Sequence, residues 1–192
     1  INVEGRAGHD VFSFSANSDG RSTKVLVKGG DGVDKATFAA GIDFSLSDLT
    51  IAGIEEFEFT GGSSNVKLPS TVVSGKNLTL SENGSGNLTL EIFPTAQTVN
   101  LSSLVFDSSI VAGTDKIVVN GSNYDKALTV TGSTIGDEIT GTFTSNDNIS
   151  SGFGNDTING QAGNDILTPG DGLDQITSGL GNDTINLAEL MA

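Results

Sequence analysis

A nine-residue repeat in the C-terminal third is the feature that most limits what this chain can fold into. Four copies follow one another without a gap: SGFGNDTIN (151–159), GQAGNDILT (160–168), PGDGLDQIT (169–177) and SGLGNDTIN (178–186). Position 4 is always Gly, position 6 is always Asp, and position 8 is always Ile or Leu. Weaker copies occupy 132–140 and 142–150, and two more lie near the N-terminus at 5–13 and 29–37. Repeats of this kind indicate the stacked coils of a solenoid.

Each repeat unit predicts a six-residue turn followed by a three-residue strand. The glycines permit the positive φ angles of a tight turn and bring backbone carbonyl oxygens inward. Only the aliphatic side chain at position 8 faces the core, and its burial recovers less free energy than the ordering of nine residues costs. We therefore expect a bound ligand to help stabilise the repeats.

The spacing of the Asp residues indicates what that ligand is. If two units form one coil, Asp147, Asp165 and Asp183 stack in one column, and Asp137, Asp156 and Asp174 stack in a second column on the opposite edge. Neighbouring coils lie about 4.8 Å apart, where two bare carboxylates repel by roughly 3 kcal/mol at an effective dielectric constant of about 20. Carboxylate and carbonyl oxygens in a flexible shell favour Ca²⁺ over Mg²⁺ or Zn²⁺. The alternative is a calcium-free solenoid in which these Asp residues only cap turns.

The predicted calcium-binding residues are the six Asp residues of the two columns, together with turn residues whose carbonyl or side-chain oxygens complete the shells. These turn residues are Gly152, Gly154, Asn155, Gly163, Asn164, Gly170, Gly172, Gly179 and Gly181. The N-terminal copies add Asp10, Gly30, Gly32 and Asp34.

Composition excludes several other functions. Asp and Glu number 24 against nine Lys and Arg, a net charge of −15, so we predict no nucleic-acid partner, because phosphate contacts need basic side chains. The absence of Cys excludes disulfides and thiolate nucleophiles, and a single His excludes a His-rich metal centre. No apolar run approaches the roughly 18 residues of a membrane span.

No arrangement of catalytic residues stands out, and we predict that the chain is not an enzyme. Neither HExxH nor GxSxG is present. His9 occupies a variable turn position, where a solvated role is expected. Glu55, Glu56 and Glu58 resemble a glycosidase carboxylate pair only loosely, since strand alternation places Glu56 and Glu58 together on the outward face.

The pattern GGxGxDxUx resembles the RTX nonapeptide of proteins secreted by Gram-negative bacteria, over 132–186 and at 5–13 and 29–37. This resemblance implies a right-handed parallel β-roll that binds Ca²⁺ between stacked turns, folds where calcium is plentiful, and is exported through an uncleaved C-terminal signal. We therefore predict an all-β protein, a right-handed parallel β-roll or β-solenoid. It is divided into N-terminal RTX-like coils (1–40), irregular coils without a metal motif (41–131), the calcium β-roll (132–186) and a C-terminal tail (187–192).

The middle of the chain lacks the nonapeptide but keeps short strand patterns separated by Gly, Ser, Asn and Asp. Two decayed units place Asp115 and Asp125 near the repeat frame, each followed by Lys, at Lys116 and Lys126. We expect each Lys to offset the preceding Asp and these coils to be metal-free.

A second resemblance concerns residues 25–62. There, GGDGVDKATF followed by AGIEEFEFTGG is similar to calcium-dependent surface-layer (S-layer) proteins of Gram-negative bacteria. It implies a non-enzymatic, calcium-binding structural module of a secreted cell-surface protein, with another copy of itself as partner. Lipopolysaccharide or another surface glycan is a further possible partner, through Arg6 and Lys35. The alternatives are the repeat region of an RTX adhesin and the C-terminal module of an RTX enzyme. The chain begins inside a repeat, which is typical of a fragment of a longer protein.

Overall fold

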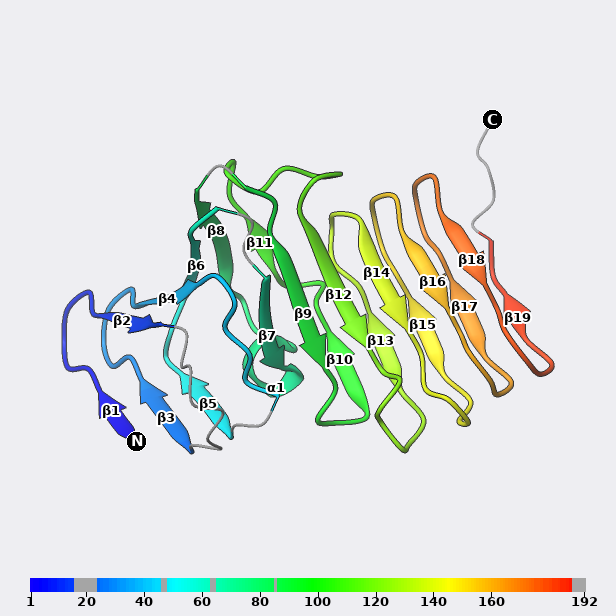
Figure 1. Ribbon diagram of the computed structural model, residues 1–192, viewed down its shortest axis with the longest axis horizontal. Helices are drawn as coiled ribbons and strands as arrows, with labels where there is room; N and C mark the ends of the chain where they lie inside the picture. Colours follow the sequence, from blue (N-terminus) through cyan, green and yellow to red (C-terminus); the bar gives the residue numbers. More distant parts are fainter. Residues whose placement is uncertain (16–23, 46–47, 63–64, 85, 188–192) are drawn as a thin grey trace.

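The protein is a parallel β-solenoid whose coils follow one another along a single long axis (Figure 1). The computed structural model describes residues 1–15, 24–45, 48–62, 65–84 and 86–187. Every strand pair in the four sheets is parallel. The prediction of an all-β parallel solenoid is confirmed.

Four sheets run along the solenoid. The first contains β1 (Asn2–Glu4), β3 (Val25–Lys28) and β5 (Leu49–Ala52). The second contains β2 (Val11–Phe14), β4 (Lys35–Ala39), β6 (Glu56–Thr60), β8 (Thr79–Asn83) and β11 (Val105–Phe106). The third contains β7 (Asn65–Pro69), β9 (Thr89–Phe93), β12 (Lys116–Asn120), β14 (Asp137–Thr140), β16 (Thr157–Asn159) and β18 (Gln175–Thr177). The fourth contains β10 (Thr98–Asn100), β13 (Thr129–Thr131), β15 (Asn148–Ser150), β17 (Ile166–Thr168) and β19 (Thr184–Ile185).

The shape of the coil changes along the chain. Between β9 and β12 the chain visits the fourth and second sheets before it returns to the third, so this coil has three sides. From β12 onward it alternates between the third and fourth sheets only. In the N-terminal part Val11 pairs with Lys35, 24 residues later, whereas in the C-terminal part Asn148 pairs with Ile166, 18 residues later. The predicted coil of two nonapeptides is confirmed for the C-terminal part, and the longer N-terminal coils were not predicted.

The number of buried side chains per strand also differs between the N-terminal and C-terminal coils. In the two-sided part the strands β15, β16 and β17 each contribute one fully buried side chain at repeat position 8, namely Ile149, Ile158 and Leu167. In the last coil Ile176 is partly buried and Ile185 is 44% exposed. In the N-terminal part the longer strands β4 and β6 contribute two each, and Phe38 packs with ring-centroid distances of 5.0 Å to Phe14 and 5.1 Å to Phe57. The N-terminal coils therefore have an apolar core large enough to stabilise themselves, while the C-terminal coils have a narrow one.

One helix occurs among the described residues, and the sequence did not predict it. It is α1 (Ser70–Val73), which buries Val72 and Val73. The segment just after it is hydrogen-bonded to both neighbouring coils. Lys76 Nζ donates to the Ile51 carbonyl oxygen at 2.9 Å, and Ser74 Oγ accepts from the Asn100 N–H at 2.9 Å. The α1 segment thus takes the place of a strand between β5 and β10.

Phe38→Ala should destabilise the protein by about 3–5 kcal/mol. Phe38 is fully buried in the aromatic stack, so its truncation leaves a cavity there. Phe143→Ala is the matched control, since 58% of Phe143 is exposed and its loss should change the unfolding free energy by less than about 0.5 kcal/mol. Urea unfolding of both variants measures the difference. Similar losses in the two would show that the stack does not stabilise the N-terminal coils.

Candidate metal centre

The predicted Asp columns are present, and each Asp stands at the turn that leads into a strand. Asp137, Asp156 and Asp174 precede or begin strands of the third sheet, and Asp147, Asp165 and Asp183 precede strands of the fourth. In Figure 1 these turns form the two opposite edges of the yellow-to-red part of the solenoid. A third column, Asp10 and Asp34, precedes β2 and β4 in the N-terminal coils.

One carboxylate oxygen of each Asp has a structural task. In five of them, Asp34, Asp156, Asp165, Asp174 and Asp183, Oδ1 accepts a hydrogen bond from the backbone N–H of the equivalent Asp one coil earlier. The distances are 2.8 Å for Asp137 N–H to Asp156, 3.0 Å for Asp156 to Asp174, 2.8 Å for Asp147 to Asp165, 3.0 Å for Asp165 to Asp183, and 2.8 Å for Asp10 to Asp34. We call this arrangement the carboxylate ladder. It shows that the Asp residues hold successive coils together through one oxygen, as the turn-capping alternative requires.

The second oxygen divides the turns into two kinds. Oδ2 of Asp34, Asp156 and Asp165 is buried without a hydrogen-bond partner, and these are three of the four such oxygens among the described residues. At most 1% of each of these residues is exposed. An unpaired buried charge is strongly unfavourable. We call these open turns, because they leave an oxygen for a ligand.

In the closed turns, a backbone N–H four or five residues earlier donates to the same oxygen. The donors are Arg6 to Asp10 (3.0 Å), Val111 to Asp115 (2.6 Å), Ser133 to Asp137 (2.7 Å) and Thr142 to Asp147 (2.6 Å). Hydrogen bonds therefore satisfy both oxygens of Asp147 and Asp115 within the protein. The predicted ligands Asp10, Asp137 and Asp147 lie on the ladder, but their second oxygen already has a donor.

Backbone conformation separates the two kinds of turn. Positions 2 and 4 of the open turns have positive φ, as at Gly30 and Gly32, and at Gly152 and Gly154. The predicted glycines at 163, 170, 172, 179 and 181 share this conformation. Arg6, Ser133 and Thr142 do not, and their N–H groups bond the carboxylate.

Gln161 shows how strongly the open shape is maintained. It occupies position 2 of the Asp165 turn with a φ of 75°, and it is the only non-Gly residue with positive φ among those described. This conformation costs an ordinary residue about 1–2 kcal/mol. A hydrogen bond of 3.0 Å from Gln161 Nε2 to Ser122 Oγ fixes the side chain.

Oxygen atoms gather at the first residue of most turns, open or closed, where that residue is glycine. In the closed Asp137 turn a Cβ on Gly132 would lie 2.7 Å from Asp137 Oδ2 and 1.9 Å from the Ser151 carbonyl oxygen. The open turns share this arrangement but leave the carboxylate oxygen without a donor. A Cβ on Gly160 would lie 2.6 Å from Asp165 Oδ2 and 2.3 Å from the Ser178 carbonyl oxygen of the next coil. A Cβ on Gly29 would lie 2.3 Å from Asp34 Oδ2 and 1.7 Å from the Gly53 carbonyl oxygen. An unpaired carboxylate oxygen beside carbonyl oxygens is the donor set that Ca²⁺ prefers, so these residues fit the predicted ion.

The side chains of the two predicted Asn residues accept hydrogen bonds from the next coil. Asn155 Oδ1 accepts from the Leu173 N–H at 2.9 Å, and Asn164 Oδ1 accepts from the Asn182 N–H at 2.7 Å. Their side chains thus bind the next coil. The role of Glu55 in the carboxylate ladder was not predicted. Its Oε2 accepts from the Asp34 N–H at 2.9 Å and so continues the N-terminal ladder by one coil. Glu55 does not follow the glycine pair of the repeat, so the only signal in the sequence is its separation of 21 residues from Asp34.

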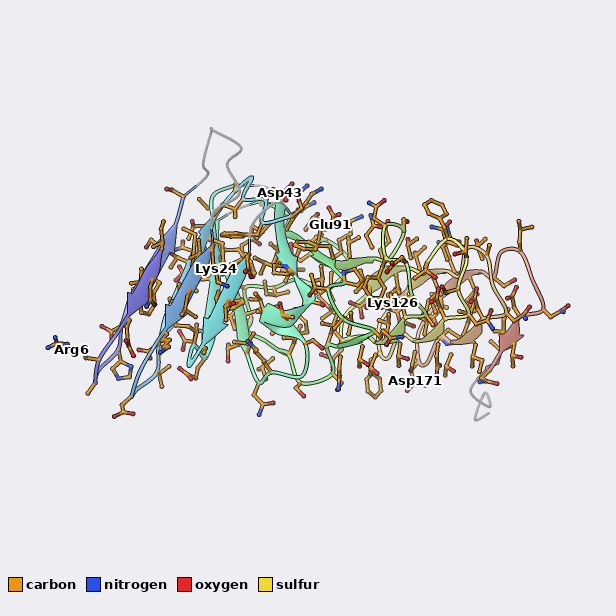
Figure 2. The ribbon with its side chains drawn as sticks, turned by 90° about the horizontal axis from the view of Figure 1, so that it is seen from below. Arg6, Lys24, Asp43, Glu91, Lys126 and Asp171 are labelled. Atoms are coloured by element: carbon orange, nitrogen blue, oxygen red, sulfur yellow. The ribbon has the colours of Figure 1, made fainter. Side chains whose placement is uncertain are left out.

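Lys35, Lys116 and Arg6 have their charged groups on the outer surface. Lys116 Nζ contacts Glu138 Oε2 at 2.8 Å, so the prediction that it offsets Asp115 is wrong, because Asp115 points inward with only 3% exposed. Lys35 contacts both Glu56 (3.4 Å) and Glu58 (3.0 Å), which places these two carboxylates on one outward face as predicted. Arg6 projects from the N-terminal end of the solenoid (Figure 2).

Burial also shifts the protonation of the ladder. Burial raises the pKa of Asp137 to about 7 in the metal-free protein. Hydrogen bonds from the Ser133 N–H and hydroxyl lower this pKa, but the effect of burial is larger. Burial raises the pKa of Asp156 and of Asp165 as well. The metal-free ladder therefore favours protonated carboxyl groups.

The stability of the chelated protein should fall as the pH rises from about 5 to about 8. A carboxyl group whose folded pKa lies above its unfolded pKa binds more protons when folded, so its protonation stabilises the fold at low pH and this is lost as the pH passes through about 7. For Asp137 the loss is about 4 kcal/mol at most. Asp137→Asn should flatten the dependence, and Asp171→Asn, at an exposed position, should not. Thermal melts in chelator from pH 5 to pH 8 measure this, and a stability that rises with pH would contradict it.

Comparison with known families agrees with the geometry. The family model of the RTX calcium-binding nonapeptide repeat, in four copies, matches residues 142–176 and 151–185. No curated protein and no solved structure matches the chain. The C-terminal coils of this protein therefore consist of RTX nonapeptide repeats, which are calcium-binding motifs.

Proposed function

We propose that the chain is a non-enzymatic, calcium-binding structural module of a secreted bacterial surface protein, and that its C-terminal coils complete their folding when calcium binds. The observation that carries this proposal is the set of buried, unpaired carboxylate oxygens at Asp34, Asp156 and Asp165. A cation that binds only the folded turns adds its binding free energy to the stability of the fold.

The charge distribution supports a calcium-dependent C-terminal part. Residues 127–192 contain nine acidic residues and neither Lys nor Arg. In the N-terminal coils, by contrast, lysines pair with acidic residues across neighbouring strands, as Lys67 does with Glu91 at 3.1 Å. Apart from Lys116, which pairs with Glu138, no cationic side chain balances the carboxylates of the described C-terminal coils, and their core is narrower. An external cation supplies what these coils lack.

The candidate catalytic residues support a structural role. His9 Nδ1 lies 2.8 Å from the Val33 carbonyl oxygen, and Glu55 is part of the ladder. Glu56 and Glu58 are bound to Lys35 on the outer surface. Each of these groups has a partner that holds neighbouring coils together.

Self-assembly into an S-layer-like lattice at the cell surface is the most specific form of the proposal. A chain with a net charge of −15 repels its own copies, and bound calcium reduces that repulsion. Exposed apolar side chains at the turns, such as Phe153 (57% exposed), Leu173 (83%) and Leu180 (76%), provide contacts that copies can share once the charge is lowered. No helix in the described part of the chain is long and apolar enough to cross a membrane.

Calcium should increase the far-UV circular dichroism of the β-structure, and a chelator should reverse the change. Asp165→Asn should weaken this response, because the amide keeps the Oδ1 acceptor for Asp147 but removes the unpaired oxygen. Asp171→Asn is the matched control, since it removes the same charge from an exposed turn residue outside the ladder. A chelated protein that keeps its full β-signal would contradict calcium-dependent folding.

Electron microscopy and light scattering of the same samples test assembly. Calcium-dependent sheets or ordered oligomers would support the lattice form of the proposal. A protein that folds with calcium but stays monomeric would favour the adhesin or enzyme-module alternatives.

A further inference from the structure

We infer that Ser133 and Thr142 take the place of the cation in the turns of Asp137 and Asp147, so that the calcium-dependent part of the roll begins only at residue 151. This inference rests on the proposed function and specifies which turns of the roll bind calcium. It divides the two predicted columns into hydrogen-bonded members and ion-binding members.

The Asp137 turn is closed by one residue. Ser133 donates its N–H to Asp137 Oδ2 at 2.7 Å, and its hydroxyl oxygen lies 3.0 Å from both carboxylate oxygens. Ser133 and Asp137 are both 2% exposed. The backbone N–H and the hydroxyl of one buried residue thus both contact Oδ2, the oxygen that has no partner in the open turns.

The Asp147 turn is closed in the same way by a different residue. Thr142 donates its N–H to Asp147 Oδ2 at 2.6 Å, and its hydroxyl oxygen lies 3.0 Å from Oδ2 and 3.2 Å from Oδ1. Thr142 is fully buried. The two closed turns lie on opposite edges of the roll, so they complete one coil.

The next coil has no equivalent closure. Gly160 and Gln161 offer no hydroxyl to Asp165, whose Oδ2 is unpaired. In the Asp156 turn the hydroxyl of Ser151 donates to the Pro169 carbonyl oxygen at 2.6 Å. The same side chain lies near Asp156 and lowers the pKa of its carboxyl group, but Asp156 Oδ2 receives no hydrogen bond. The change from closed to open turns therefore occurs on both edges within a single coil.

The closed coil presents the groups to which the open coil attaches. The N–H groups of Asp137 and Asp147 donate to Oδ1 of Asp156 and Asp165, both at 2.8 Å. Because Oδ2 of each Asp in this coil accepts hydrogen bonds from within the coil, the coil can provide these donors before calcium arrives. It acts as a folded edge on which the calcium-dependent coils assemble.

Hydrogen–deuterium exchange of the wild-type protein in chelator tests the inference without any substitution. The amides of β14 and β15 should be protected, while those of β17 and β19 should exchange rapidly and become protected when calcium is added. Equal exchange in all four strands of the chelated protein would overturn the inference.

Calcium titration of two isosteric variants provides the second test. Asp165→Asn should lose bound calcium relative to the wild type, whereas Asp137→Asn should bind as much as the wild type, because its amide can accept from the Ser133 N–H and donate to the Ser133 hydroxyl. An equal loss of bound calcium in the two variants would overturn the inference. A wild-type protein that binds no calcium would instead contradict the proposed function, and the exchange experiment would still decide whether the Asp137 and Asp147 turns are stable alone.

Discussion

The hydrogen bond between an Asp carboxylate and the backbone N–H one coil earlier is the interaction on which the solenoid depends. It recurs in the N-terminal coils, where Asp10 donates to Asp34, and in both columns of the C-terminal roll. Each bond fixes the register of the strand that follows, since it is made at the turn leading into that strand. The same carboxylate must be buried to make this bond, and burial is what creates the need for a partner at its second oxygen.

Two chemical solutions to that need occur along the chain. Where the residue four or five positions before the Asp has an ordinary φ, its N–H points toward the carboxylate and closes the turn, and Ser133 and Thr142 add hydroxyls. Where φ is positive, the second oxygen stays unpaired beside carbonyl oxygens. Glycine at position 2 therefore allows the positive φ that leaves the carboxylate oxygen free for an ion instead of a backbone hydrogen bond. Gln161 keeps this positive φ although the conformation is unfavourable for a residue with a side chain.

The distribution of apolar residues follows the same division. The N-terminal coils bury an aromatic stack around Phe38 and pair their lysines with neighbouring carboxylates. The two-sided coils bury one aliphatic side chain per strand and contain no basic residue after Lys126. A gradient from apolar to ionic stabilisation therefore runs from the N-terminus to the C-terminus, and it makes the C-terminal coils the ones that respond to calcium.

The sequence by itself determined the parallel solenoid, the 18-residue coil and the two Asp columns, because a nine-residue period with fixed Gly, Asp and aliphatic positions allows few other arrangements. It did not predict α1, the three-sided coils or the role of Glu55, since none of these has a periodic signal. Only the tertiary structure separated Asp165 from Asp137, two residues with the same place in the repeat. The difference lies in the φ angle and hydrogen bonds of a neighbouring turn residue, and these depend on how the backbone of adjacent coils packs rather than on the motif itself.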